Sequence, residues 1–231
     1  MKTIGLIGGL SWESSLEYYR LINQGVKQKL GGLHSAQCLL YSVDFGPIEE
    51  LMRQGDWQQI NQLLVQAALH LKQGGAEFIL ICSNTIHKCA DSIIEQTGMP
   101  VLHIADAAAQ AIKLRDLKKV GLLGTKFAME EAFYRNRLKE QHGIDVIIPE
   151  ENEREFINTV IFQELCLGVL NPDSKEQFKK IINKLMGLGA EGIVLGCTEI
   201  PLLIKQADVN APVFDTMTLH AAAAVDYAFG V

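Results

Sequence analysis

The stretch Gly75–Thr85, which reads GAEFILICSNT, recurs 114 residues later as Gly189–Glu199, which reads GAEGIVLGCTE. Each copy starts with a glycine turn, continues through an apolar run of strand length and ends in small polar residues. An apolar run of this kind is typical of a buried strand in a parallel sheet. The repeat places Ser83 and Cys197 at equivalent positions.

Two further blocks repeat in the same order. Ile4–Gly9 matches Val120–Thr125 at an offset of 116, and Pro100–Leu102 matches Pro212–Phe214 at an offset of 112. We therefore expect a duplicated α/β unit whose halves are related by a pseudo-twofold axis. In such a fold Ser83 and Cys197 would face each other across a cleft, which suits chemistry on both faces of one carbon.

The composition agrees with a parallel α/β protein. The chain has 231 residues, 48% of them hydrophobic, and a mean hydropathy of +0.12. Apolar runs of strand length alternate with segments of helical period, which predicts parallel sheets covered by helices. The expected strands lie near 2–8, 36–43, 77–83, 99–104, 118–124, 144–148, 191–197 and 211–215. The expected helices lie near 12–29, 57–73, 84–96, 106–115, 127–141, 151–167, 174–187 and 216–229.

Charge and cysteine content exclude several classes of protein. A net charge of −6 disfavours nucleic acid as a partner. No apolar run reaches the length of about 18 residues that a membrane helix requires, and no signal peptide is visible. Five cysteines, an odd number without dense spacing, are typical of reduced thiols. We expect a cytoplasmic protein that binds neither nucleic acid nor a membrane.

Small polar residues follow four of the predicted strands, where ligands of α/β sheets gather. Each group precedes a predicted helix, whose first N–H groups can hold a carboxylate. The alternative is that these residues only cap the helices, as Ser, Thr and Asn often do. The candidates are Ser11, Ser83, Asn84, Thr85, Thr125, Cys197, Thr198 and Glu199.

The two equivalent residues suit different roles. Cys197 lies between Gly196 and a polar turn, where a helix N-terminus would lower its pKa from about 8.5 and favour the thiolate. The Ser83 hydroxyl is a poor base but can deliver a proton to a carbanion. Cys38, Cys89 and Cys166 are interpreted as small buried hydrophobic residues.

Other sites fit less well. Cys82, His87 and Cys89 lack a fourth metal ligand nearby, so no metal site is predicted. The glycines after the first strand do not spell a dinucleotide-binding motif, and Ser83 lacks the glycines of a hydrolase elbow. His87, four residues after Ser83, is either its partner or a solvated helix residue.

These motifs resemble the aspartate/glutamate racemase family over essentially the whole chain. That family carries a Cys-Asn-Thr-x-His segment, met here as Ser83–His87 with serine in place of cysteine, and a Gly-Cys-Thr-Glu segment, present as Gly196–Glu199. Ile4–Ser11 and Leu123–Thr125 also resemble family motifs. The chain is most similar to the branch in which a hydroxyl residue replaces the first catalytic cysteine.

The resemblance implies two pseudo-symmetric flavodoxin-like domains with parallel sheets, with the active site at their interface. The domains would comprise residues 1–98 plus 209–231, and residues 99–208. The enzyme would need no cofactor and would often be a homodimer. The resemblance assigns the two catalytic roles to Ser83 and Cys197. Carboxylate binding falls on Asn84, Thr85, Thr125 and Thr198.

The leading hypothesis is an amino-acid racemase acting on glutamate or aspartate, in which Cys197 removes the Cα proton and Ser83 returns one. A single thiol also suffices to protonate an enolate after decarboxylation, as in the similar arylmalonate decarboxylases. From a different class, the chain could be a non-catalytic module that binds an amino acid or a dicarboxylate. The intact Gly196–Glu199 segment argues against the loss of catalysis.

Overall fold

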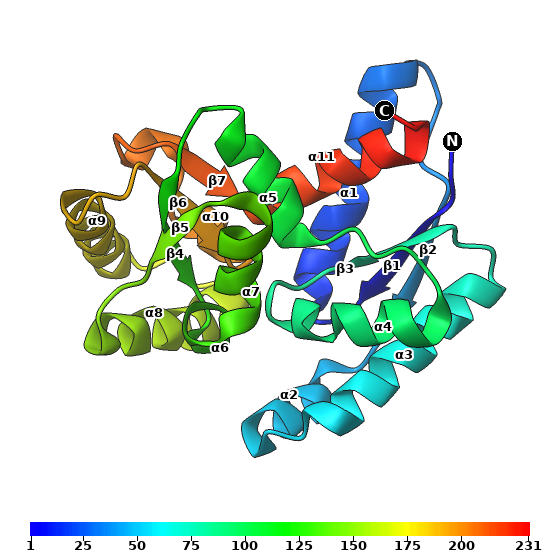
Figure 1. Ribbon diagram of the computed structural model, residues 1–231, viewed down its shortest axis with the longest axis horizontal. Helices are drawn as coiled ribbons and strands as arrows, with labels where there is room; N and C mark the ends of the chain where they lie inside the picture. The colour runs from blue at the N-terminus through cyan, green and yellow to red at the C-terminus, as the bar shows by residue number, and fades with distance from the viewer. The chain divides into compact units, whose positions relative to one another are not determined.

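The computed structural model describes residues 1–231 and divides them into two compact units (Figure 1). Unit 1 comprises Met1–His103 and His220–Val231, and unit 2 comprises Ile104–Leu219. Each unit contains one parallel sheet with helices around it. The predicted α/β fold with two parallel sheets is confirmed. None of the helices combines the length and the apolar character that a membrane span requires.

The sheet of unit 1 has the strand order β2-β1-β3, and all neighbours are parallel. Val101 adds an isolated parallel bridge to Ile79 on the outer side of β3. The strands are β1 (Ile4–Gly8), β2 (Cys38–Ser42) and β3 (Phe78–Ile81). The helices are α1 (Trp12–Leu30), α2 (Phe45–Gln54), α3 (Trp57–Gln73), α4 (Ala90–Thr97) and most of α11 (Thr216–Phe229).

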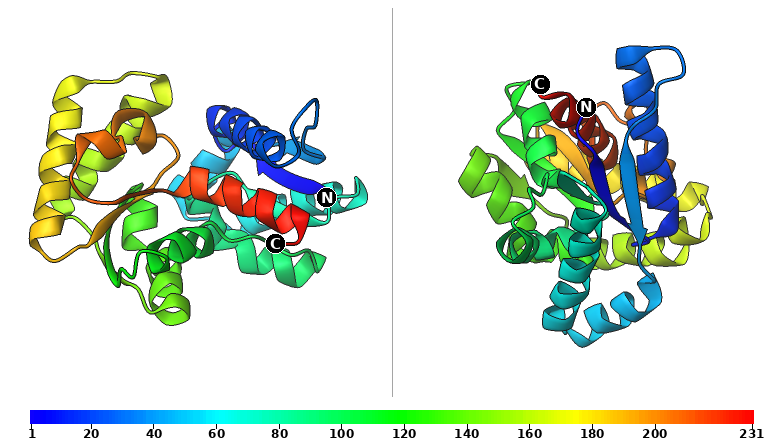
Figure 2. Two further views of the ribbon diagram at one scale, coloured as in Figure 1. Left: turned by 90° about the horizontal axis from the view of Figure 1, so that it is seen from above. Right: turned by 90° about the vertical axis from the view of Figure 1, so that its right-hand side faces the viewer.

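Two faces of this sheet carry different helices (Figure 2). A Cβ atom at Gly8 would lie 2.6 Å from Ser15 Oγ of α1, whereas Leu39 Cδ1 points toward Gly74 at the end of α3. Helix α11 packs beside α1, because a Cβ atom at Gly25 would lie 3.0 Å from Val225. The two termini lie close together in this unit, where Lys2 N–H donates to Ala228 O at 2.8 Å.

The sheet of unit 2 has the order β5-β4-β6-β7, again fully parallel. Its strands are β4 (Lys119–Gly124), β5 (Asp145–Ile147), β6 (Gly192–Gly196) and β7 (Val213–Asp215). One continuous core joins these strands to the helices. The helices are α5 (Ile104–Lys113), α6 (Lys126–Glu130), α7 (Ala132–Asn136), α8 (Glu151–Gln163), α9 (Pro172–Gly187) and α10 (Ile200–Leu203).

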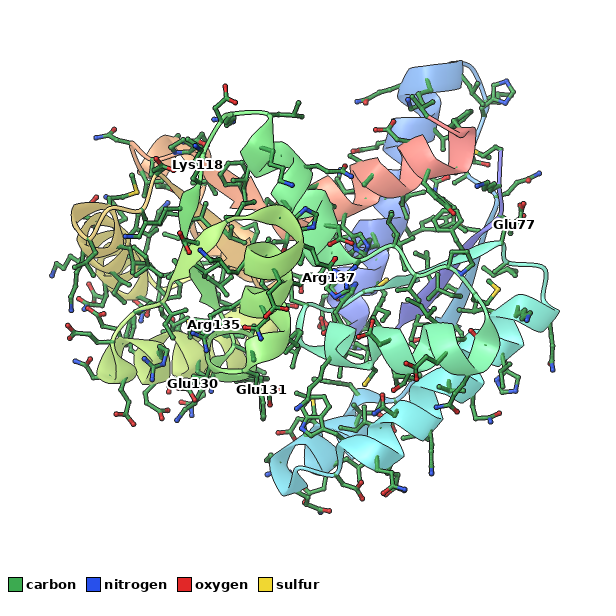
Figure 3. The ribbon with its side chains drawn as sticks, viewed as in Figure 1. Glu77, Lys118, Glu130, Glu131, Arg135 and Arg137 are labelled. Atoms are coloured by element: carbon green, nitrogen blue, oxygen red, sulfur yellow. The ribbon has the colours of Figure 1, made fainter.

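The internal repeat has a structural counterpart in the two sheets. The order β2-β1-β3-Val101 in unit 1 corresponds to β5-β4-β6-β7 in unit 2. The glutamates of the two Gly-Ala-Glu motifs also make equivalent hydrogen bonds. Glu77 Oε2 accepts the N–H of Thr3 at 2.7 Å, and Glu191 Oε2 accepts the N–H of Lys118 at 2.6 Å (Figure 3 labels Glu77 and Lys118). Each carboxylate thus holds the start of its central strand.

Several elements differ from the sequence-based expectation. The segment 99–104 forms only the bridge at Val101, and it lies against β3 of unit 1. The strand expected at 211–215 is β7, and it pairs with β6 of unit 2 rather than joining the first sheet. The boundaries between units therefore fall after His103 and after Leu219, not at 98 and 208. The boundaries at 98 and 208 were implied by the family resemblance, whereas the repeat of Pro100–Leu102 in Pro212–Phe214 agrees with the observed strand pairing.

The helix expected over 127–141 is broken. Glu131 adopts an extended conformation (φ −74°, ψ 149°), so α6 ends before it and α7 begins after it. Helix α2 was not expected at all; Asp44 caps it by accepting the Gly46 N–H at 3.2 Å. Helices α3 and α11 begin and end at the expected residues.

Candidate active site

In unit 1, the first candidate residue lies in the loop that leaves β3. The hydrogen-bond ladder between β1 and β3 extends one residue past the end of β3, where Cys82 N–H donates to Ile7 O at 2.9 Å. Ser83 follows, half-buried, and a 3₁₀ helix over Thr85–Cys89 comes next. Asn84 and Thr85 are buried at the start of this helix. The turn therefore brings Ser83, Asn84 and Thr85 to the carboxyl end of the sheet.

His87 fixes the backbone of Ser83. Its Nδ1 lies 2.6 Å from Ser83 O. Because a carbonyl oxygen only accepts, Nδ1 carries the proton and donates it. The side chain of His87 is buried, so the alternative of a solvated helix histidine is wrong.

His87 belongs to a cluster of three buried histidines. Its ring centroid lies 4.7 Å from that of His103 and 5.4 Å from that of His220. His220 Nε2 donates to Leu102 O at 2.7 Å, so its Nδ1 accepts from the Tyr18 hydroxyl at 2.8 Å. Burial, followed by the neighbouring His103 and His220, lowers the pKa of His87 well below its usual 6.5. The imidazole of His87 is therefore neutral.

This cluster predicts that acid destabilises the protein. The pKa of His87 is lowered in the folded state, so its contribution to stability is complete above the unfolded pKa of about 6.5 and is lost as pH falls below it. We expect the free energy of unfolding to drop by up to about 1.4 kcal/mol per pH unit for this residue. Urea unfolding measured at a series of pH values tests this. His87→Gln should reduce the slope of the free energy of unfolding against pH by the contribution of one proton. His34→Gln, in an exposed loop, should leave that slope unchanged. Equal slopes in the wild type and both variants would contradict the prediction.

Ser11 lies next to the Ser83 loop within unit 1. It caps α1, because its Oγ accepts the N–H of Ser14 at 3.4 Å. Ser14 Oγ lies 3.1 Å from Cys82 O, which ties the start of α1 to the residue before Ser83. Between β1 and this cap, Gly9 has φ +80°, and a Cβ atom there would lie 2.1 Å from Val43 O. Only glycine fits this turn.

In unit 2, the second candidate residue leaves the end of β6. Cys197 is 6% exposed and follows Gly196, the last residue of the strand. Its Sγ donates to Glu199 Oε2 at 2.9 Å. Thr198 Oγ1 donates to the same oxygen at 2.8 Å. Glu199 Oε2 therefore accepts hydrogen bonds from the side chains of both Cys197 and Thr198.

This geometry corrects the expected charge state of Cys197. Burial and the Glu199 carboxylate raise the pKa of the Cys197 thiol well above 9.0, outweighing the opposite effect of the Glu199 backbone N–H. A lowered pKa was expected from a following helix N-terminus. Helix α10 has only four residues, so its dipole is weak and the nearby carboxylate dominates. In the structure Cys197 is a thiol, and Glu199 is positioned to accept its proton.

Replacing Glu199 tests this arrangement directly. In Glu199→Gln the negative charge is gone, so we expect the pKa of the Cys197 thiol to fall. The rate at which iodoacetamide alkylates Cys197 at neutral pH should rise roughly tenfold, because the thiolate is the reactive species. Mass spectrometry of the Cys197 peptide measures that rate separately from the other thiols. The matched control is Glu155→Gln, because Glu155 is an exposed carboxylate whose ion-pair partner is Lys126. Unchanged alkylation of Cys197 in Glu199→Gln would contradict the assignment.

Thr125 lies beside Cys197 at the same sheet edge. Strands β4 and β6 are neighbours, with Gly124 opposite Gly196. A Cβ atom at Gly124 would lie 2.8 Å from Gly196 O, so glycine allows the two strand ends to approach. Thr125 caps α6 and accepts the Ala128 N–H at 3.2 Å. The interpretation as a helix cap is thus confirmed for Thr125, as it is for Ser11.

The candidates thus form two groups, one in each unit. Unit 1 brings together Ser11, Ser83, Asn84 and Thr85, and unit 2 brings together Thr125, Cys197, Thr198 and Glu199. Sequence reasoning assigned Glu199 to substrate binding and did not identify its bond to the thiol. It also missed His103 and His220, which lie far from His87 in sequence and carry no recognisable spacing.

The remaining thiols near these loops are buried, and burial favours their protonated form. Burial raises the pKa of Cys82 far above its usual value and that of Cys89 to about 12. Both pack as buried residues, as interpreted for Cys89. No group of three or more His, Cys, Asp or Glu side chains is placed to hold a metal ion.

Comparison with known proteins places the chain in a racemase family. Residues 7–224 match the family model described as Asp/Glu/Hydantoin racemase. A Yersinia pestis structure, named as a candidate Asp/Glu racemase, is 55% identical with a TM-score of 0.94, over 99% of this chain and 100% of that one. A Pyrococcus horikoshii structure, named as an aspartate racemase homologue, is 37% identical with a TM-score of 0.86, over the same shares. A glutamate racemase of Exiguobacterium sibiricum is 26% identical over 168 residues, which cover 70% of this chain and 56% of that protein. The chain thus spans little more than half the length of that curated relative.

Proposed function

Since the chain belongs to the Asp/Glu/Hydantoin racemase family, a family of isomerases, we propose that it is a cofactor-independent racemase of glutamate, aspartate or both. The names of its relatives support this substrate class: one is a glutamate racemase and another an aspartate racemase homologue. The single observation that carries the proposal is the bond from Cys197 Sγ to Glu199 Oε2. It joins a thiol to a proton acceptor at a strand end.

The proposed reaction begins with this pair. The positive ammonium group of an amino acid beside Cys197 would offset the negative charge of Glu199, which otherwise raises the pKa of the thiol. The thiol proton then passes to Glu199, and the Cys197 thiolate removes the Cα proton from one antipode. Ser83 Oγ donates its proton to the opposite face of Cα and regains one from water, and Glu199 releases the former thiol proton to water, so that every group returns to its starting protonation state. The configuration at Cα is inverted.

The intermediate carries extra negative charge, which must be stabilised. Backbone N–H groups and hydroxyls at the strand ends would supply hydrogen bonds to the substrate carboxylate, as in other sites that stabilise developing charge. We assign this role to Ser11, Asn84 and Thr85 from unit 1, and to Thr125 and Thr198 from unit 2. Their position directly after β1, β3, β4 and β6 supports the assignment.

The proposal requires Ser83 and Cys197 to act on one substrate from opposite sides of its Cα. Their equivalent positions after β3 and β6 support this arrangement. In a liganded state, Ser83 Oγ and Cys197 Sγ should each lie roughly 3–3.5 Å from Cα, the near-attack range. A crystal structure with bound aspartate or glutamate measures both distances. Side chains that open onto different surfaces would end the proposal.

Hydrogen exchange at Cα tests the activity itself. Both enantiomers of each amino acid are incubated with the protein in heavy water, and deuterium at Cα is measured by NMR. Exchange together with loss of optical rotation supports a racemase. Binding without exchange would identify a non-catalytic binding module. Release of CO₂ from an arylmalonate, without Cα exchange of amino acids, would identify the decarboxylase reaction on this fold.

We further propose that the protein works in the cytoplasm as a homodimer. All five cysteines are thiols in the structure, which suits a reducing compartment.

A further inference from the structure

Ser14, in the first turn of α1, lies against the loop that carries Ser83. Its side chain is buried, and its Oγ lies 3.1 Å from Cys82 O. Cys82 is itself fully buried and directly precedes Ser83 in the chain. The hydroxyl of Ser14 therefore reaches the residue next to the proposed proton donor, although the proposed reaction gives it no role.

The hydrogen atom of the Ser14 hydroxyl has two acceptors within reach. Serine in a helix often donates to a carbonyl group of the preceding turn, and Ser11 O also lies 3.1 Å from Ser14 Oγ. Ser11 O, however, accepts two bonds from Ser15, from its N–H at 3.4 Å and from its Oγ at 3.0 Å. No other group of the chain donates to Cys82 O. Because a buried carbonyl oxygen without a donor is destabilising, we assign the hydrogen to the bond with Cys82 O.

This bond fixes one of the two peptide units that flank Ser83. A peptide unit is planar, so the position of Cys82 O also determines the orientation of the Ser83 nitrogen. The second unit is fixed by His87, whose Nδ1 donates to Ser83 O at 2.6 Å. With both planes held, the φ and ψ angles of Ser83 have little freedom. Ser14 and His87 thus determine the direction in which the Ser83 side chain leaves the backbone.

We propose that Ser14 is a positioning residue for Ser83, a role that rests on the proposed racemase function. Ser14 acts through Cys82 O and aims Ser83 Oγ at the face of Cα to which it delivers a proton. Such placement matters, because a displacement of about 1 Å can lower a rate about 100-fold. Cys197 belongs to the other unit, so proton removal by Cys197 should not depend on Ser14.

Comparing exchange with inversion in Ser14→Ala tests the proposal. Deuterium incorporation at Cα and the change in optical rotation are measured in heavy water for both enantiomers. Inversion should fall roughly tenfold, as expected for the loss of one hydrogen bond. Exchange of the antipode whose Cα–H faces Cys197 should stay within about twofold of the wild-type rate, because its base is intact.

Ser174→Ala is the matched control for this comparison. Ser174 is a buried serine in the first turn of α9, and its Oγ donates to Glu164 Oε1 at 3.0 Å. Its loss should change neither exchange nor inversion. A wild-type ratio of exchange to inversion in Ser14→Ala, or the same change of that ratio in Ser174→Ala, would overturn the proposal.

A double variant distinguishes this route from an effect of Ser14 on Ser11, whose Oγ lies 3.3 Å from Ser14 Oγ. If Ser14 acts through Ser83, adding Ser14→Ala to Ser83→Ala should lower inversion no further, because the group that Ser14 positions is already gone. If Ser14 acts through Ser11, the two losses should multiply. Multiplied losses would contradict the assigned role.

Amide hydrogen exchange, measured by mass spectrometry, tests the structural link independently of racemisation. In Ser14→Ala the amides of residues 82–85 should exchange severalfold faster, because Cys82 O has lost its donor, whereas those of β3 should keep their wild-type rates. A wild type without Cα exchange would end the proposed function, and faster exchange at 82–85 would still support the link. Unchanged exchange at 82–85 would overturn the inference even in an active racemase. Circular dichroism confirms that each variant is folded.

Discussion

Cys197→Ala is expected to abolish Cα–H exchange of both enantiomers, with a loss in turnover of roughly 10⁴-fold. The proposed base is the Cys197 thiolate, and Glu199, its hydrogen-bond partner, serves as acceptor of the thiol proton. Without the sulfur atom, the proposed base for the Cα proton is gone. The measurement is deuterium incorporation at Cα in heavy water, with aspartate and glutamate as substrates.

Cys38→Ala is the control for this experiment. It removes a thiol from the first residue of β2, at the opposite end of the unit 1 sheet from Ser83. Its exchange rate should match the wild type. Full activity in Cys197→Ala would mean that the base is assigned to the wrong residue. A loss in both variants would point instead to a general effect of removing a cysteine.

Ser83→Ala is expected to separate exchange from inversion. The antipode whose Cα–H faces Cys197 should still exchange its proton for deuterium, because its base is intact. Inversion should fall by roughly 10²-fold or more, because no hydroxyl delivers a proton to the other face. Comparing deuterium incorporation with the change in optical rotation measures the two processes separately. If both fell together, Ser83 would not be a proton donor specific to one face.

The serine also predicts an asymmetry in the wild type. A serine hydroxyl is far less acidic than a thiol, so Ser83 rarely acts as a base. We expect kcat to be much higher for the antipode whose Cα–H faces Cys197. Because free enantiomers are equally stable, kcat/KM must be equal in the two directions, so the slow antipode must have a correspondingly lower KM. Ser83→Cys should bring the two kcat values closer. Equal kcat and equal KM in the wild type would contradict the mechanism.

The positions of most strands and their parallel class follow from the amino-acid sequence alone, whereas the sheet that β7 joins was assigned wrongly. The repeat of Gly75–Thr85 in Gly189–Glu199 predicted two equivalent units, and apolar runs predicted most of the strands. These features can be recognised in a short stretch of sequence, because a parallel strand that is buried on both faces requires a continuous apolar run. For the same reason the position of Ser83 and Cys197 at strand ends follows from the apolar runs that precede them.

The electrostatics of the candidate site, in contrast, depend on tertiary packing. A helix N-terminus after Cys197 suggested a lowered pKa, but the following helix is short and Glu199 lies against the thiol, so the pKa is raised. The histidine cluster likewise joins His87 to His103 and His220 from distant parts of the chain. A pKa depends on burial and on charges a few ångströms away. Sequence spacing determines neither the burial nor the nearby charges. It does determine which residues follow the end of a strand.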